Sequence, residues 1–261
     1  MGIAALALLA ALQTNTPTKG KLLWSDEFLK DGRPDPTIWG YDTGQVANNE
    51  KQFYPVDRPE NSRVLNGSLI IEARKDGYQG HEITSARLVT RGKKEILYGR
   101  VEVRAKVPTG RGTWPAIWTL GTNIKEVGWP MCGEIDMMEF VGYDPDRMHF
   151  NVHTKAYNHA IGTNKGTSID VPKAWGGFHV YAMNWSAERI DWEFDGKRVF
   201  SYKNPENATI EQWPFDAPQY LLLNLAIGGD WGGAKGIDDA IFPAKFEVDY
   251  VRVYAPVEPR K

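Results

Sequence analysis

The chain has 261 residues, of which 42% are hydrophobic and 25% are charged, a balance typical of one globular domain. Its formal net charge of -2 gives neither a basic footprint for nucleic acid nor a strongly acidic tail. We therefore expect a neutral partner and no nucleic acid.

The first 19 residues differ in character from the rest of the chain. An apolar run at 3–12, too short to span a membrane, is followed by a polar stretch of Thr, Asn and Pro, as at a secretory signal and a mature start. No Lys or Arg precedes the run, so a short buried or disordered leader is the alternative. We predict a leader over 1–19, a single domain over 20–261, and export to the cell surface, the periplasm or the medium.

Residues 30–60 are polar, aromatic and rich in turn formers, which predicts long loops that lie over a sheet. Beyond residue 60 apolar and polar side chains alternate, which favours strands over helices. The pair Asp195-Gly196 predicts a two-residue hairpin turn, because both central positions of that turn need positive φ. Many strands without intervening helices indicate an all-β antiparallel sandwich rather than a βα barrel. The predicted strands lie within 68–74, 98–108, 149–157, 179–185, 189–202, 220–229 and 246–256.

The stretch "GEIDMMEF" at 133–140 places three carboxylates in an otherwise apolar strand. Side chains alternate between faces, so Glu134 and Asp136 share a face and Glu139 points away from them. One extra residue, a β-bulge within Met137-Met138, returns Glu139 to the shared face. The stretch is either a charged strand with one stray acid or a bulged strand with a row of carboxylates.

A row of carboxylates suits retaining glycoside hydrolysis, in which one group attacks the anomeric carbon and a second protonates the leaving oxygen. Glu134 and Glu139 fit these two roles, and Asp136 between them can set the protonation of one Glu. Like charges on one face raise the pKa of at least one member, so the row titrates as a unit. A solvated acidic strand or a Ca²⁺ site built from the same oxygens is the alternative.

Aromatic residues indicate a surface for sugar. Trp114 and Trp118 are four residues apart, so an extended strand places both on one face, where flat rings suit sugar rings. Trp231 lies in the Gly-rich stretch "IGGDWGG", where a ligand can approach the backbone. The alternative for any of the ten Trp is a place in the core. The five His show no zinc spacing, and Cys132, the only cysteine, can form no internal disulfide.

The motifs "GTWPAIWTLG", "GEIDMMEF", "VHT" and "FEVDYVRVY" resemble glycoside hydrolase family 16, in particular its laminarinase-like endo-β-1,3-glucanases. The resemblance runs from about residue 22 to 254. It implies a concanavalin A-like β-jelly roll of two curved antiparallel sheets with an open substrate cleft. It also implies that Glu134 is the nucleophile, Glu139 the acid/base catalyst and Asp136 an assisting carboxylate.

The resemblance further assigns residues around the cleft and a possible cation site. The residues that would bind sugar are Asn49, Trp114, Trp118, His153 and Trp231. From the residues alone, an Asx-turn is the commoner explanation for a loop Asn such as Asn49, and a core or edge position is the alternative for His153. The family often binds one structural Ca²⁺, for which the matching positions are Glu27, Gly67 and Asp249; no cofactor is expected for catalysis.

Taken together, these features predict a monomeric, retaining endo-glycosidase that cleaves internal β-1,3 bonds of a laminarin-type β-glucan. Two alternatives remain open. The first is a family 16 hydrolase acting on mixed-linkage β-1,3-1,4-glucan or on a marine galactan. The second is a carbohydrate-binding protein on the same fold without activity, which would need the aromatic cleft but not both Glu134 and Glu139.

Overall fold

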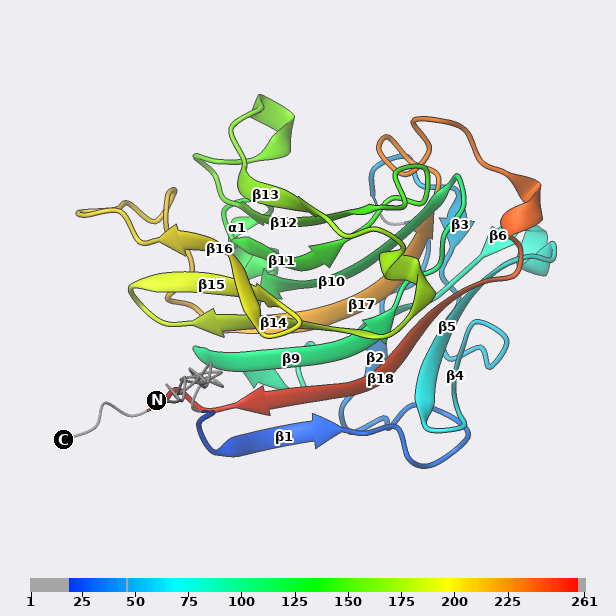
Figure 1. Ribbon diagram of the computed structural model, residues 1–261, viewed down its shortest axis with the longest axis horizontal. Helices are drawn as coiled ribbons and strands as arrows, with labels where there is room; N and C mark the ends of the chain where they lie inside the picture. The colour runs from blue at the N-terminus through cyan, green and yellow to red at the C-terminus, as the bar shows by residue number, and fades with distance from the viewer. Residues whose placement is uncertain (1–18, 46, 258–261) are drawn as a thin grey trace, which may run out of the picture.

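The computed structural model describes residues 19–45 and 47–257, and these form two packed β-sheets, one of ten strands and one of eight (Figure 1). The strands of both sheets run in similar directions and curve together, so the molecule is a sandwich. The predicted leader, residues 1–19, lies outside the described residues except for Lys19.

The ten-stranded sheet contains both ends of the described chain, because β1 pairs with β18 from Leu22↔Tyr254 to Asp26↔Val251. In spatial order its path is β16 (Lys197–Lys203), β15 (Arg189–Phe194), β14 (His179–Trp185), β9 (Gly99–Lys106), β18 (Ala244–Tyr254), β5 (Ser68–Lys75), β6 (Ile83–Thr84) and β3 (Gln52–Phe53), with β1 (Leu22–Asp26) beside β18 and β4 (Ser62–Leu65) beside β5. All its pairings are antiparallel except that of β3 with β6.

The eight-stranded sheet carries the acidic stretch near its middle. Its path is β13 (Lys165–Asp170), β12 (Arg147–His153), β11 (Glu134–Glu139), β10 (Thr113–Gly121), β17 (Gln219–Ile227), β7 (Arg87–Val89) and β2 (Gly40–Tyr41), with β8 (Glu95–Ile96) beside β17. The described residues contain one short α-helix, α1 (Ile124–Val127), and four 3₁₀ turns (Tyr78–Gly80, His159–Ile161, Ala174–Gly176 and Asp239–Ile241).

The core lies between the two sheets and is built from the inward-facing residues, which alternate with outward-facing residues along each strand. Ile135 and Met137 of β11, with Leu223 and Leu225 of β17, pack there with no exposed surface. Burial of side chains of this size stabilises the folded state by about 1.5–3 kcal/mol each. Since inward positions are apolar, the outward positions of β10, β11 and β17 are free to carry polar and aromatic groups.

The predicted sandwich and its turn chemistry are confirmed. Asp195 and Gly196 have φ of 48° and 75° and join β15 to β16 in an antiparallel hairpin. The described part of the loop region 30–60 holds only the short strands β2 and β3, as expected, and Glu50 forms a bridge to Gly228 that ties this region to the end of β17. No helix among the described residues is long and apolar enough to cross a membrane.

Candidate active site

The bulge predicted in the acidic stretch is present. On the β10 side, Trp118 pairs with Asp136 and Ile117 with Met138, so Met137 has no partner of its own. On the β12 side the register shifts by one residue between Asp136 and Glu139. The extra residue returns Glu139 to the face of Glu134 and Asp136.

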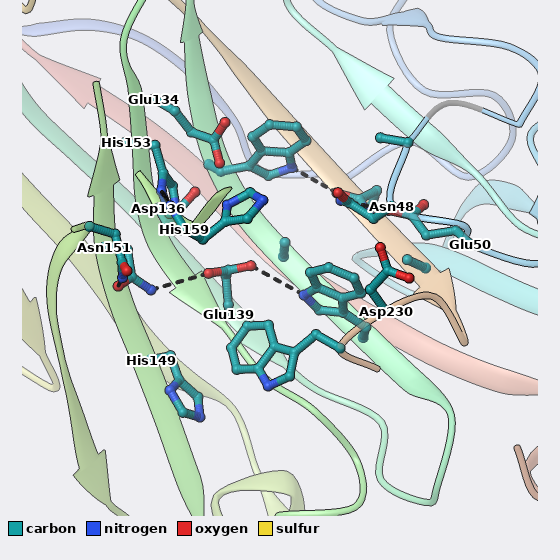
Figure 2. A pocket seen from close by; sticks show the side chains of 18 of the residues that line it. Asn48, Glu50, Glu134, Asp136, Glu139, His149, Asn151, His153, His159 and Asp230 are labelled. Atoms are coloured by element: carbon teal, nitrogen blue, oxygen red, sulfur yellow. Dashed lines mark hydrogen bonds and ion pairs between the residues drawn. The ribbon is translucent and has the colours of Figure 1, made fainter. Parts of the chain in front are cut away.

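The three carboxyl groups line one cavity of about 380 Å³ on the outer face of the eight-stranded sheet (Figure 2). Glu134 and Glu139 are half-buried, whereas Asp136 is only 1% exposed. Neighbouring strands and loops supply the rest of the lining, including Trp114, Trp118, His149, Asn151, His153, Asn224 and Trp231.

Nitrogen donors hold both glutamates. The Trp129 indole Nε1 donates to Glu134 Oε2 at 2.6 Å. Glu139 accepts on each oxygen, from Trp114 Nε1 at 3.2 Å and from Asn151 Nδ2 at 3.3 Å. These donors orient the carboxyl groups before a ligand arrives and favour their ionised forms.

Burial works against ionisation in this row. It raises the pKa of Glu134 to about 8, and the neighbouring Asp136 charge adds to the effect. Burial also raises the pKa of Glu139 to about 7 and that of Asp136 well above its usual range. Near neutral pH the row therefore keeps protons on some members while others are ionised, which is the state that acid/base chemistry needs.

His153 completes the row from β12. The backbone N–H of His159 donates to His153 Nδ1 at 3.3 Å, which assigns the imidazole proton to Nε2. Nε2 lies 3.3 Å from Asp136 Oδ2, but outside hydrogen-bond geometry, and Oδ2 has no hydrogen-bond partner among the described residues. Ligand atoms of Glu134, Asp136 and His153 lie within 4.8 Å of one another. Because Trp129 faces Glu134 and the proton on His153 faces Asp136, both carboxyl groups of this set are already opposed by N–H groups, and the set fits proton chemistry better than a resident metal.

The three tryptophans predicted to bind sugar all line the cavity. Trp114 and Trp118 lie on the same face of β10, as their spacing predicted, and the ring of Trp231 packs edge-on against that of Trp114 at 5.5 Å between centroids. Trp118 donates from Nε1 to Asn224 Oδ1 at 2.7 Å, and the Arg87 guanidinium lies 4.6 Å from its ring. Two aromatic surfaces therefore flank the carboxylates.

Asn49 takes a different place from the other predicted sugar-binding residues. Its Nδ2 donates to Asp230 Oδ1 at 2.8 Å, and it does not line the cavity, whereas Asn48, Glu50 and Asp230 do. The Asp230 backbone N–H also donates to the Asn48 carbonyl, so the two loops are joined. Asn49 thus holds together the loops that form one wall, and a direct contact between Asn49 and sugar stays a prediction.

Sequence reasoning missed several residues of this cavity. Asn151 could have been found, because it lies two residues from both His149 and His153 on β12 and therefore shares their face. Asn224 could have been found from its even spacing along β17. Arg87 and Glu50 carry no such signal, and neither does Trp129, which binds Glu134 without lining the cavity. Burial raises the pKa of Glu50, which accepts from Gln52 Nε2 at 2.7 Å.

The residues predicted for calcium lie along β1, β18 and the β4–β5 turn. Both carboxylate oxygens of Glu27 bind Arg252, at 2.8 and 2.9 Å. Asp249 accepts from Arg104 on one oxygen only, at 2.6 Å, and Gly67 lies in the turn with φ of 76°. The Glu27 and Asp249 carboxylates each pair with an arginine in this structure, and a cation held by Glu27, Asp249 and the Gly67 carbonyl stays a prediction.

Comparisons with known proteins agree with this architecture. The chain is 53% identical over 247 residues to a β-glucanase of Rhodothermus marinus, covering 91% of this chain and 86% of that one. It is 34% identical to glucan endo-1,3-beta-glucosidase A1 of Niallia circulans, covering 89% of this chain but only 37% of that longer protein. The laminarinase structure from Rhodothermus marinus superposes with a TM-score of 0.89 at 51% identity, covering 92% of this chain and 98% of that one. Residues 49–252 match the model for glycosyl hydrolases family 16, and the chain belongs to this family.

Proposed function

We propose that the protein is a retaining endo-glycosidase that hydrolyses internal β-1,3-glucosidic bonds of laminarin-type β-glucans. The observation that carries the proposal is the bulge in β11, which brings three carboxyl groups into one open, tryptophan-lined cavity. A β-glucanase and a laminarinase are among the proteins it resembles over nearly its whole length.

In the first step the Glu134 carboxylate attacks the anomeric carbon and forms a glycosyl ester. The bond to the leaving oxygen breaks, and that oxygen takes the proton of Glu139. Trp129 holds one Glu134 oxygen and leaves the other for attack. The pKa values of about 8 for Glu134 and about 7 for Glu139 both lie near neutral pH, so a fraction of the molecules there has Glu134 ionised and Glu139 protonated, the state that this step needs.

In the second step Glu139, now ionised, takes a proton from water, and the hydroxide oxygen displaces Glu134 from the anomeric carbon. Two inversions give net retention. Burial raises the pKa of Asp136 well above its usual range, so Asp136 takes part in holding the protons of the row beside the nucleophile.

The decisive assay is release of reducing ends from laminarin by the purified protein. The wild type is expected to release short glucose oligomers, and Glu134→Gln to release none while remaining folded. Glu139→Gln should lose most of its kcat/KM on laminarin but little of its kcat/KM on a glycoside with an activated aryl leaving group, which departs without a proton. Hydrolysis by Glu134→Gln near the wild-type rate would overturn the assignment of the nucleophile.

The same assay on lichenan and agarose tests the alternative substrates. A wild-type rate on either that exceeds the rate on laminarin would replace the β-1,3-glucan by that polymer, with the catalytic residues unchanged. Binding of laminarin without any hydrolysis would support the non-catalytic alternative.

Three further properties belong to the proposal. We expect export of the full chain, tested by fractionation of cells that express it, and a monomer, tested by light scattering. We also propose a stabilising Ca²⁺ that uses Asp249 and the Gly67 carbonyl, with no part in catalysis. The carboxylate of Asp249 on β18 and the Gly67 carbonyl are oxygen donors of the type that Ca²⁺ prefers.

A further inference from the structure

The amide of Asn151 lies between Glu139 and a second amide. Asn151 Nδ2 donates to Glu139 Oε2 at 3.3 Å, as Figure 2 shows, and Asn151 Oδ1 accepts from Asn164 Nδ2 at 3.0 Å. A carboxamide has one donating end and one accepting end. Because Asn164 occupies the accepting end, the donating end must face the carboxyl group.

Space for this amide is created on the neighbouring strand. Gly166 of β13 pairs with Asn151 of β12 in register. A methyl group built on Gly166 would lie 2.0 Å from Asn151 Oδ1 and 2.4 Å from the Phe150 carbonyl oxygen. Gly166 does not have positive φ, so glycine is required here for the space and not for the backbone conformation.

We propose that Asn151 is the positioning residue of the acid/base carboxyl group. Asn164 holds the Asn151 amide in the productive orientation, and Gly166, which has no side chain, leaves room for that amide. The inference rests on the proposed function through the role of Glu139. Asn151 touches Glu139 and acts through it, so it is a positioning residue.

The donor matters at one stage of the reaction. Glu139 becomes a carboxylate when it gives its proton to the leaving oxygen, and Asn151 stabilises the charge on Oε2 while Trp114 stabilises Oε1. The other titratable or charged groups of the cavity are Glu134 and Asp136 on β11, His149 and His153 on β12, His159 on the following 3₁₀ turn, Arg87 on β7, and Glu50 and Asp230 on the loops. Loss of the donor makes Glu139 a weaker acid, which slows departure of a poor leaving group and leaves a good one nearly unaffected.

The first experiment compares Asn151→Ala with the wild type on two substrates. On laminarin at pH 6, kcat/KM is expected to fall about tenfold, as for loss of one hydrogen bond to a charged group. On the 2,4-dinitrophenyl glycoside of laminaribiose the fall should be less than about twofold. The alkaline limb of the pH profile on laminarin should move up by about one pH unit, because the pKa of Glu139 rises.

A double-mutant cycle then tests the role of Gly166. Gly166→Ala should show the same dependence on leaving group as Asn151→Ala, and the double variant should be no slower than Asn151→Ala alone. Ser168→Ala, two residues along the same face of β13, is the matched control and should behave as wild type. If Gly166→Ala does not fold, Asn164→Ala takes its place in the cycle, and a smaller loss of kcat/KM is expected.

Equal losses on both substrates, or an unmoved alkaline limb, would show that Asn151 has only a structural role and overturn the inference. Additive losses in the cycle would show that Gly166 acts elsewhere. Both results leave the proposed function standing, which fails only if the wild type does not hydrolyse laminarin.

Discussion

Replacement of Trp129 by Phe removes the indole donor to the nucleophile and keeps an aromatic ring. In the wild type Nε1 lies 2.6 Å from Glu134 Oε2. This contact lowers the pKa of Glu134, against the burial that raises it to about 8. Without the donor, the pKa of Glu134 rises further and less of the nucleophile is ionised.

The size of the effect follows from the contact. Hydrogen bonds to charged groups contribute roughly 1.5–3 kcal/mol, and Trp129 is 39% exposed, so the lower value of about 1.5 kcal/mol applies. That value corresponds to a change of about one pH unit and to roughly tenfold in rate. Activity needs ionised Glu134 and is lost as the pH falls through its pKa, so the acidic limb of the profile moves to higher pH.

The assay is kcat/KM on laminarin between pH 4 and 9. Trp129→Phe should lose about tenfold below the acidic limb and approach the wild type above it. Trp175→Phe, which changes a tryptophan of similar exposure, 36%, on a distant turn, is the matched control. A loss that is the same at every pH would refute the reasoning, because it would mean that Trp129 acts only as a surface for sugar.

Three other predictions concern the same row and the distal cation. Glu134 binds its proton more tightly in the folded protein, with a pKa of about 8 against 4.5, so folding stability falls as the pH rises between these values. The Tm of Glu134→Gln should therefore exceed that of wild type at pH 8 and equal it at pH 4. Equal Tm values at pH 8 would contradict this prediction. Deletion of Met137 should turn Glu139 towards the core and abolish laminarin hydrolysis, whereas Met137→Leu should remain active; an active deletion variant would show that the bulge is dispensable. Added Ca²⁺ should raise the Tm of wild type but not of Asp249→Asn, and no rise in either would remove the calcium proposal.

Alternation along a strand limited the acidic stretch to two alternatives, a strand with one stray acid or a bulged strand, and the family resemblance favoured the bulge. Glu134 and Asp136 are an even number of residues apart and Glu139 an odd number, so a shared face required one extra residue. The same rule placed Trp114 and Trp118 together on β10. Where side chains follow a regular strand, the sequence contained enough information to predict the face.

Residues held by loops were not predictable in this way. Trp129 reaches Glu134 only because the segment between β10 and β11 folds back over the cavity, and no periodicity describes that path. The path of the loop at 47–50 also determines that Asn48 and Glu50 line the cavity while Asn49 binds Asp230. The need for glycine at 166 depends on the neighbouring strand, which a single strand's pattern does not reveal.

The position of β11 within its sheet also determines how the enzyme responds to heat. β11 is bonded on both sides, to β10 and to β12, and its inward residues are part of the common core. The spacing of the three carboxyl groups is thus maintained by a strand that is paired on both edges and packed on the core, and such strands are among the last parts of a fold to open. Hydrolysis should therefore persist until the whole domain melts, with inactivation and loss of the circular dichroism signal at one temperature.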